Sequence, residues 1–476
     1  MTIDSFRRQH PRLIYQGFTH GLSAGGQPPG QVKLQVKYRF LLEPDIKFQP
    51  QIEISGLSAS QLDHLQPDFL QALLFQLGLA ELPSYWKAAC PPEILVEAGS
   101  LDNYQVEWWQ KLLRLGLGEF YFTNQIDFTQ PEFVKISSAD GASHAQPPRP
   151  PDASHYQTPY LVPVGGGKDS GLTLGLLDQN RAQYHTLVLE PASPAAARLC
   201  ALSSTQHQIT ARRTICPNLL KLNQRGYLNG HTPFSAYLAF LSTTIAHLQG
   251  HQQILVANES SANQANLTYR NTPINHQWSK SFEFEQTFRR YSTQYLGSST
   301  APPSQTKSSQ AEYLSFLRPL NELQIAQKFA QFPELLPHFR SCNVGQKQDD
   351  WCHRCPKCVF VFTMLFPFID PAKLTTQIFK HNLFANIELL STFQALADPT
   401  LDKPLECVGT DQEVQQALKL ALAWHQEQQF ELPPVIHHLE NWLKNQIISE
   451  NLLENWNKSH NLDEKLVKIL KILKKS

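Results

Sequence analysis

A run of three glycines between a predicted strand and a predicted helix constrains the fold of this chain more than any other feature. The segment from Tyr160 to Val164 is typical of a short strand, and Ser170 to Asp178 is typical of a helix. Glycines let backbone N–H groups approach an anion, and a helix N-terminus adds positive potential at the same place. Further strands are predicted at His185–Glu190 and Gln253–Ala257, with a helical pattern between them. Strands that alternate with helices predict an α/β fold with a parallel sheet covered on both faces.

The residues of the glycine loop separate two kinds of phosphate-binding loop. A Walker A loop needs glycine at position 162 and serine or threonine at position 169, where this chain has Val162 and Asp169. The loop instead resembles the pyrophosphate loop of the ATP pyrophosphatase superfamily, whose usual form is Ser-Gly-Gly-x-Asp-Ser, with Gly165 replacing the leading serine. The resemblance implies an adenine nucleotide alpha hydrolase-like, Rossmann-like domain. Such enzymes cleave ATP to AMP and pyrophosphate, usually by adenylating a carboxylate or amide oxygen.

The same resemblance implies a role for each position of the loop. Phosphates are expected on Gly165, Gly166, Gly167 and Ser170, Lys168 is expected to neutralise them, and Asp169 is expected to act through Mg2+.

Four of the eight cysteines lie close together in the sequence and predict a metal site. They are Cys342, Cys352, Cys355 and Cys358. Four thiolates from two nearby loops can close a tetrahedral shell, so a structural Zn2+ is the leading prediction. An iron–sulfur cluster uses the same ligands and stays open as an alternative. The 7-cyano-7-deazaguanine synthases, another pyrophosphate-loop family, have a similar arrangement. A metal here is expected to hold the regions of Arg340 and Lys357 near the carboxyl edge of the sheet.

The other four cysteines are scattered and are expected to be ordinary thiols: Cys90, Cys200, Cys216 and Cys407.

Changes in composition along the chain divide it into four predicted parts. An N-terminal α+β domain (1–140) precedes a Pro-rich linker (141–159), the pyrophosphate-loop domain with the cysteine cluster (160–370) and a helical C-terminal region (371–476). Apolar residues alternate with charged or amide residues from Val32 to Phe40, which predicts a half-exposed strand. The run from Ile46 to Ile54 is interrupted by Pro50, which favours an edge strand. The tail from Glu464 to Ser476 is amphipathic and is expected to dock on its own protein.

Net charge and hydropathy limit the partners of this chain. Lys+Arg 41 balance Asp+Glu 41, which argues against a protein that binds nucleic acid through a broad basic surface. The longest apolar stretch, Val359 to Ile369, is much shorter than the roughly 20 residues that span a bilayer. No signal peptide is evident. The protein is therefore expected to be cytoplasmic, without an integral membrane segment, and to act on a small molecule.

Several further segments make the resemblance more specific. They are Leu222-Asn-Gln-Arg-Gly226, Asn229-Gly-His-Thr-Pro233, Ala257-Asn-Glu-Ser-Ser261, Asn275-His-Gln-Trp-Ser-Lys-Ser-Phe282, Leu317-Arg-Pro-Leu-Asn-Glu-Leu323, Trp351-Cys-His-Arg-Cys-Pro-Lys-Cys358, Ser84-Tyr-Trp-Lys-Ala88 and Lys403-Pro-Leu-Glu-Cys-Val-Gly409. Together with the loop they resemble the UDP-N-acetylmuramoyl-L-alanyl-L-glutamate epimerase family (MurL), over roughly residues 80 to 420.

The resemblance implies a reaction in peptidoglycan synthesis, and hence a role in cell-wall biogenesis, cell shape and cell division. Such enzymes use ATP and Mg2+ to convert the terminal L-glutamate of UDP-MurNAc-L-Ala-L-Glu to D-glutamate through an acyl-adenylate. The candidate catalytic residues for proton transfer are His231, Glu259, His276 and Lys280, with Glu259 also a candidate Mg2+ ligand. The arginines expected to pair with the substrate's pyrophosphate and carboxylates are Arg212, Arg213, Arg270 and Arg318.

Two alternatives remain at this point. One is a different adenylating ligase or amidase, of the deazapurine or tRNA-modification type. The other is a zinc-stabilised module that binds a nucleotide without turnover, an idea favoured only by the missing leading serine at Gly165.

Overall fold

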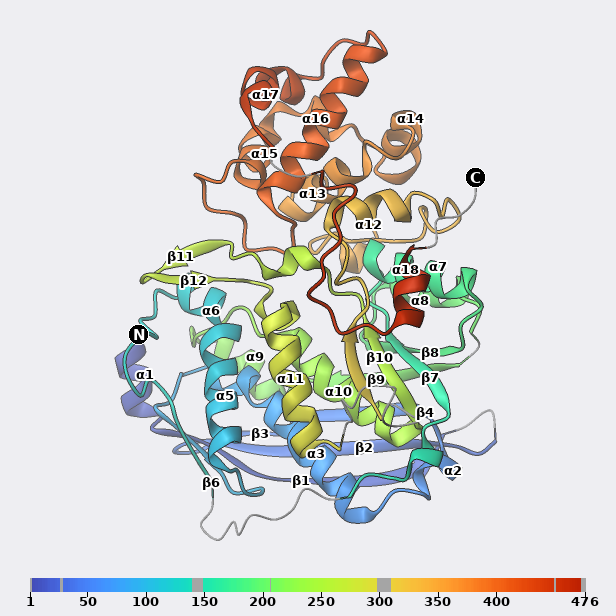
Figure 1. Cartoon of the computed structure of the whole chain (residues 1–476). Coiled ribbons are helices and arrows are strands. Elements are labelled where there is room, and N and C mark those ends of the chain that lie inside the picture. Colours follow the sequence, from blue (N-terminus) through green and yellow to red (C-terminus); the bar gives the residue numbers. More distant parts are fainter. Residues whose placement is uncertain are drawn as a thin grey trace.

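The protein is built on one large mixed sheet with a helical region stacked on one end of it (Figure 1). The structure is a computed structural model that describes residues 2–25, 29–138, 149–205, 207–297, 310–448 and 451–471, with Lys347 described by its backbone alone. The first part of the predicted linker, residues 141–148, lies outside these residues.

The sheet has eleven strands in the order β13-β10-β7-β8-β9-β4-β2-β1-β5-β6, with β3 paired to β2. The strands are β1 (Arg12–Ala24), β2 (Gln31–Leu42), β3 (Ile46–Phe48), β4 (Gln51–Ser58), β5 (Glu93–Val96), β6 (Lys135–Ser138), β7 (Thr158–Pro163), β8 (Tyr184–Glu190), β9 (Gln208–Thr214), β10 (His251–Val256) and β13 (Glu312–Ser315). A separate hairpin is formed by β11 (Leu267–Tyr269) and β12 (Thr272–Ile274).

The half of the sheet that carries the glycine loop is parallel, as predicted. Strands β13, β10, β7, β8 and β9 pair in parallel with one another. Neighbouring residues of these strands enter different cores: Leu161 and Ile254 pack on one face, whereas Val162 and Leu255 pack on the other. A sheet buried on both faces gives near-continuous apolar strands, which is the pattern that the sequence shows here.

Helices cover both faces of this parallel half. One face carries α10 (Phe234–Gln249) and α11 (Phe282–Tyr295), and on the same side α3 (Pro67–Glu81) and α5 (Asn103–Gly116) contact the N-terminal strands β1 and β6. The other face carries α7 (Lys168–Gln179), α8 (Pro194–Leu202) and α12 (Glu322–Phe329). Ring contacts between Trp108 and Tyr291 hold α5 against α11.

The N-terminal strands extend this same sheet and do not form one of their own. Strand β4 pairs antiparallel with β9, from Gln51 opposite Thr214 to Ser55 opposite Thr210. One apolar core contains both Val36 of β2 and Ile254 of β10. The predicted boundary near residues 140–160 therefore interrupts neither the hydrogen-bonded sheet nor this core.

Strand β2 matches its predicted alternation, with Leu34, Val36 and Tyr38 buried. The prediction for Ile46–Ile54 was wrong in one respect, because β4 is a central strand paired on both sides with β2 and β9. Pro50 falls between β3 and β4, so its missing N–H removes no hydrogen bond from either ladder, and its carbonyl accepts one from the Tyr38 N–H at 3.0 Å.

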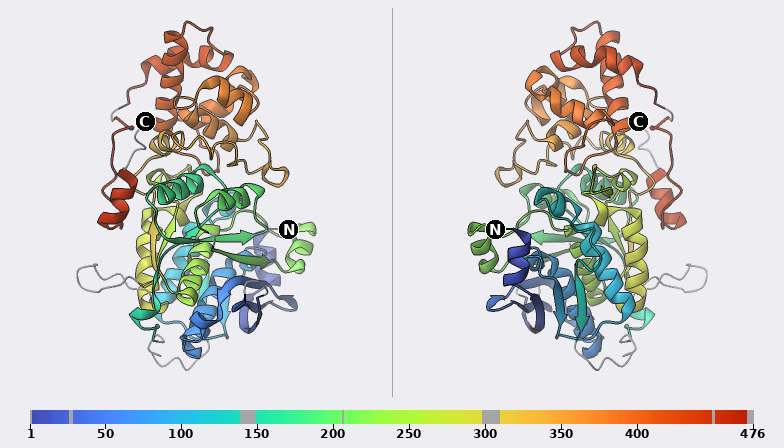
Figure 2. Two further views of the ribbon diagram at one scale, coloured as in Figure 1. Left: turned by 90° about the vertical axis from the view of Figure 1, so that its right-hand side faces the viewer. Right: turned by 90° about the vertical axis from the view of Figure 1, so that its left-hand side faces the viewer.

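The C-terminal region is helical, as predicted, and packs over α12. It contains α15 (Leu390–Ala397), α16 (Asp411–Glu427) and α17 (Pro434–Asn445), and α15 and α16 pack on α13 (Pro356–Leu365), which precedes the region. The last described helix, α18 (Glu464–Lys471), returns to the sheet and packs on α7, as both side views in Figure 2 show. Its residues Leu466, Ile469 and Leu470 are buried, which confirms the predicted docking of the tail as far as Lys471. Among the described residues, no helix combines the length and apolar character that crossing a bilayer requires.

Candidate active site

A cavity of about 530 Å³ opens at the carboxyl ends of the parallel strands. Strand β7 is followed in the chain by β8 and β9 on one side of it, and then by β10 and β13 on the other. The order in which strands are added to the sheet therefore reverses between β7 and β10. Open α/β sheets bind ligands at such a switch point. The cavity is lined by the glycine loop, the segment after β8 and the segment after β10, and by residues 340–343, Lys280, Lys357 and Cys407.

The glycine loop connects β7 to α7 and faces this cavity. Gly165, Gly167, Asp169 and Ser170 line it, and the Gly165 N–H donates to Ser170 Oγ at 3.1 Å. Gly166 has φ of +91°, and a Cβ there would lie 2.6 Å from the Ala196 nitrogen. The loop can follow this path only with glycine at position 166.

Lys168 is placed differently from the prediction that it neutralises phosphates. Its side chain is completely buried, and its ammonium group donates to Asp169 and to Glu322 at the start of α12. Burial alone would lower the pKa of Lys168, but the two carboxylates outweigh burial and raise it. Lys168 thus joins the loop to α12 through salt bridges to Asp169 and Glu322.

Three carboxylates lie close to one another at the glycine loop. Asp169 belongs to the loop itself, and the other two, Glu259 and Glu322, are buried. Burial raises the pKa of Glu259, and the neighbouring Asp169 raises it further while Lys280 opposes the shift. Burial likewise raises the pKa of Glu322 to about 8, against the attraction of Lys168. Asp169, which lines the cavity, has a lowered pKa because Lys168 and Lys357 outweigh its burial.

Lys280 and Cys407 form a close pair on the cavity wall. The Lys280 ammonium donates to Cys407 Sγ at 3.2 Å, and Lys357 donates to the Cys407 carbonyl. Burial would raise the pKa of Cys407, but Lys280 and His276 outweigh it and lower the pKa to about 5. This direction sets Cys407 apart from Cys200, whose pKa burial raises to about 11.

His231 and His276 lie together behind Cys407. The two rings have their centroids 4.6 Å apart, and Nδ1 of each faces the same oxygen of Glu119. Burial opposes the charged form of His276, yet hydrogen bonds to Cys407 and Glu119 raise its pKa to about 9. Burial and the neighbouring His276 lower the pKa of His231 to about 4, so only one of the two rings is protonated near pH 7.

The four predicted metal ligands meet at one point, on the loop that closes the cavity. Sγ of Cys342 lies 3.9 Å from Sγ of Cys355, and Sγ of Cys352 lies 3.7 Å from Sγ of Cys358. Backbone N–H groups donate to these sulfurs, among them Gly345 to Cys342 at 3.0 Å.

The cysteine loop also contacts the glycine loop directly. The Arg340 N–H donates to the Gly166 carbonyl at 2.9 Å, and the Lys168 N–H donates to Ser341 Oγ at 3.4 Å. Arg340 and Lys357 both line the cavity, where they were expected.

The four candidate arginines have different surroundings. Arg213 lines the cavity, held by two hydrogen bonds to Glu81 at 2.8 Å. Arg318 is fully buried and donates to the carbonyls of Glu259 and Lys280, so the prediction that it binds substrate was wrong. Two others lie at the surface: Arg212 pairs with Glu190, and Arg270 lies over the Tyr269 ring.

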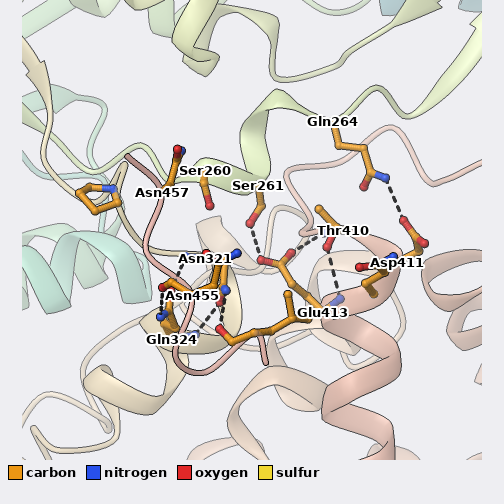
Figure 3. A pocket seen from close by; sticks show the side chains of 13 residues that line it. Ser260, Ser261, Gln264, Asn321, Gln324, Thr410, Asp411, Glu413, Asn455 and Asn457 are labelled. Atoms are coloured by element: carbon orange, nitrogen blue, oxygen red, sulfur yellow. Dashed lines mark hydrogen bonds between the residues drawn. The ribbon is translucent and has the colours of Figure 1, made fainter. Parts of the chain in front are cut away.

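A second cavity, of about 320 Å³, lies between the sheet and the C-terminal region (Figure 3). Glu413 of α16 accepts hydrogen bonds there from Ser261 Oγ and from the backbone N–H of Glu322 and Thr410. Asn321 and Gln324 form a capping box at the start of α12, in which the side chain of each accepts a hydrogen bond from the backbone N–H of the other. The polar groups of this cavity hydrogen-bond α16 to the segment after β10 and to the start of α12. These bonds hold Glu322 in its position near the glycine loop.

Sequence reasoning missed Cys407, Glu119 and Glu322. Cys407 and Glu322 lie in segments that support the family resemblance, Lys403–Gly409 and Leu317–Leu323, and this was the signal available for them. Glu119 had no comparable signal, because α6 (Gly118–Thr123) meets His231 and His276 only through the tertiary fold.

Comparison with known proteins agrees with this arrangement. The MurL N-terminal domain model matches residues 26–303, and the MurL C-terminal domain model matches residues 338–454. The chain is similar to proteins named UDP-N-acetyl-alpha-D-muramoyl-L-alanyl-L-glutamate epimerase from three bacteria. The relative from Xanthomonas oryzae pv. oryzae is 32% identical over 73% of this chain and 74% of its own length. Those from a Micromonospora species and from Salinispora tropica are each 32% identical, over 75% and 71% of this chain and 75% and 70% of their own lengths. The cavity, formed by residues of both matched regions, lies in a chain that belongs to the MurL family.

Proposed function

We propose that this protein epimerises the terminal L-glutamate of UDP-MurNAc-L-Ala-L-Glu to D-glutamate at the expense of ATP, as a cytoplasmic step of peptidoglycan precursor synthesis. The observation that carries the proposal is the cavity, which sets the glycine loop opposite Lys280 and Cys407. The names of the three relatives supply the substrate.

The chemistry gives a reason to combine ATP with epimerisation. A carboxylate resists loss of its α-proton, because the carbanion would place a second negative charge beside the first. Adenylation removes the first charge and makes the α-proton more acidic. A base can then take the proton, an acid can return it to the opposite face, and hydrolysis frees the product.

The glycine loop supports an ATP pyrophosphatase type of nucleotide site in this proposal. The backbone N–H groups of Gly167 and its neighbours surround the start of α7, where the helix dipole favours phosphate. Arg340 at the rim of the cavity adds a cation on the same side. Lys168 contributes by holding Asp169 in place.

The carboxylates near the loop fit a Mg2+ ion that accompanies ATP. Asp169 lines the cavity as an anion, and its charge helps to raise the pKa of the buried Glu259. Asp169 would hold the ion, with Glu259 behind it, and the bound ion supplies positive charge that offsets the phosphates. Lys280 lies on the same wall and keeps its own charge in the presence of these carboxylates.

The four cysteines fit a single structural Zn2+ ion. Sulfurs about 2.3 Å from one tetrahedral ion stand about 3.8 Å apart, and the two sulfur pairs here are 3.9 and 3.7 Å apart. A cluster of several iron atoms would hold its cysteine sulfurs farther from one another. In this role the ion fixes residues 340–343 and Lys357 against the cavity.

The test is turnover of UDP-MurNAc-L-Ala-L-Glu with ATP and Mg2+ in D2O. We expect D-glutamate that carries deuterium at the α-carbon, together with AMP and pyrophosphate. Product without solvent deuterium would exclude deprotonation, and release of ADP would exclude the adenylate. ATP binding without any release of AMP would instead support a nucleotide-binding module.

A further inference from the structure

Cys407 is held in the cavity wall by contacts from two distant parts of the chain. Its loop, Lys403–Gly409, is fastened to the segment after β10: Asn266 donates to the Pro404 carbonyl at 2.8 Å, and Gln277 donates to the Val408 carbonyl at 3.1 Å. On the other side Lys357, between two of the clustered cysteines, donates to the Cys407 carbonyl. The thiol therefore has a fixed position in the same cavity as the glycine loop.

The charged groups around Cys407 are arranged to keep it as a thiolate. Lys280 donates to Sγ at 3.2 Å, and His276 and Lys357 add positive charge nearby that lowers the pKa of the thiol. The negative groups stand behind these cations: Glu119 behind His276, and Asp169 and Glu259 beside Lys280. Glu406 is the adjacent acid, and burial raises its pKa.

A thiol, an imidazole and a carboxylate in this order form an activated nucleophile. His276 uses Nδ1 to contact Glu119, so its other nitrogen is the one that can face Cys407. A base that touches the nucleophile and is itself oriented by a third group is the arrangement that enzymes use for covalent catalysis. A thiolate that forms at so low a pH is a weak base, which makes proton abstraction from carbon the less suitable task for it.

We infer that Cys407 is a catalytic nucleophile that accepts the glutamyl group from the adenylate and carries it as a thioester while the α-carbon is inverted. The inference rests on the proposed function. Sγ attacks the acyl carbon, the C–S bond forms as the C–O bond to AMP breaks, and that electron pair leaves with AMP. After inversion, water adds to the thioester and releases the D-glutamyl carboxylate and the Cys407 thiolate, with two protons passing to solvent.

Acylation of Cys407 also prepares Lys280 to act as a base. The negative charge of the thiolate is one of the interactions that keep the Lys280 ammonium protonated against its burial. A thioester is neutral, so its formation lowers the pKa of Lys280. The ammonium can then release its proton to solvent, and the amine lies on the wall of the cavity that holds the acyl group. The α-proton moves to this amine, and an acid or water on the opposite face returns a proton to the carbanion.

The first experiment traps the covalent species. The full-length protein is mixed with substrate, ATP and Mg2+, quenched in acid within one turnover and analysed by intact mass spectrometry. We expect a mass increase equal to the substrate less one water, located on the peptide that contains Cys407 and removed by hydroxylamine. Absence of this adduct in a reaction that releases AMP and D-glutamate would overturn the inference.

Variants separate the thioester from the adenylate. Cys407→Ala should still release AMP and pyrophosphate, because the phosphate loop is intact, but should lower D-glutamate formation at least 100-fold and return L-glutamate. Cys200→Ser, which changes a buried thiol outside the cavity, is the matched control and should keep both activities. Epimerisation by Cys407→Ala within a few-fold of the parent protein would refute the nucleophile. Loss of AMP release from the parent protein would refute the proposed function instead.

A third measurement does not depend on turnover, and in the parent protein it needs no variant. Iodoacetamide alkylates thiolates, so alkylation of Cys407 should reach half its maximal rate near pH 5, whereas Cys200, whose pKa burial raises to about 11, should react slowly up to pH 9. In Glu119→Gln the midpoint for Cys407 should rise by at least one pH unit, because His276 loses the carboxylate that favours its charge. An ordinary midpoint near pH 8.5 in the parent protein would contradict the inference.

Discussion

At the scale of single residues, the glycines of the glycine loop are not equivalent. Gly166 has a positive φ and no room for a Cβ, whereas a Cβ at Gly165 would meet only Ser170 Oγ at 3.9 Å. Gly166→Ala should therefore introduce about 1–3 kcal/mol of strain in the loop and weaken ATP binding roughly tenfold or more. Gly165→Ala is the matched control and should keep the parent affinity, as should Gly165→Ser, which restores the usual leading serine. Calorimetric titration with ATP distinguishes them, and equal affinities for both alanine variants would contradict this account.

Lys168 is a second residue whose part depends on burial. Removing its charge in Lys168→Ala leaves Glu322 buried without its partner, which typically costs about 3–5 kcal/mol of stability. The double variant Lys168→Met with Glu322→Gln removes both charges and should lose clearly less. Urea unfolding of the three proteins checks this. If the single variant is as stable as the double variant, the ion pair has no such structural role.

The residues of the site were predictable to different degrees. The loop and the cysteines could be found because neighbours in the sequence are neighbours in the site. Cys407 could not, because its reactivity comes from Lys280 and His276, more than a hundred residues earlier in the chain. The burial of Lys168 also depends on Glu322 from a different helix.

At the scale of elements, the cysteine loop acts as a brace for the glycine loop. Cys355→Ser should lower the bound zinc from about one per chain and weaken ATP binding, because Arg340 and Ser341 then lose their fixed places against Gly166 and Lys168. Cys216→Ser is the control, since this buried cysteine directly precedes α9 (Pro217–Gln224), far from the cluster in sequence, and its side chain makes no capping hydrogen bond. Elemental analysis together with ATP titration tests the link. Full ATP affinity in a zinc-free variant would show that the two loops are independent.

The periodicity of apolar residues predicted individual strands, but it did not predict which strands pair in the sheet. Strands β2, β7, β8 and β10 lie close to their predicted ranges because local burial patterns specify them. The pairing of β4 with β9 could not be predicted, since nothing in the sequence of either strand identifies a partner more than 150 residues away. Pro50 was misleading for the same reason: it marks the end of a strand and carries no information about the position of that strand in the sheet.

At the scale of the whole molecule, the shared sheet predicts that the two halves fold together. Fragments 1–148 and 149–476 should each be insoluble or unfolded when expressed alone, because each exposes an apolar face of the common core and an unpaired strand at β4 or β9. Co-expression should restore a soluble complex that purifies as one species. A 1–148 fragment that gives a dispersed, folded NMR spectrum by itself would contradict this prediction.

The join between β4 and β9 also bears on how such a chain can change over evolutionary time. A nucleotide-binding unit that ended at β9 could be copied into other genes as a self-contained cassette. Here that edge is occupied by β4, a strand from an earlier part of the chain, so a copy of the parallel half alone would leave β9 without its partner. Exchange of the parallel half by recombination would therefore carry a structural cost that substitution of residues around the cavity does not.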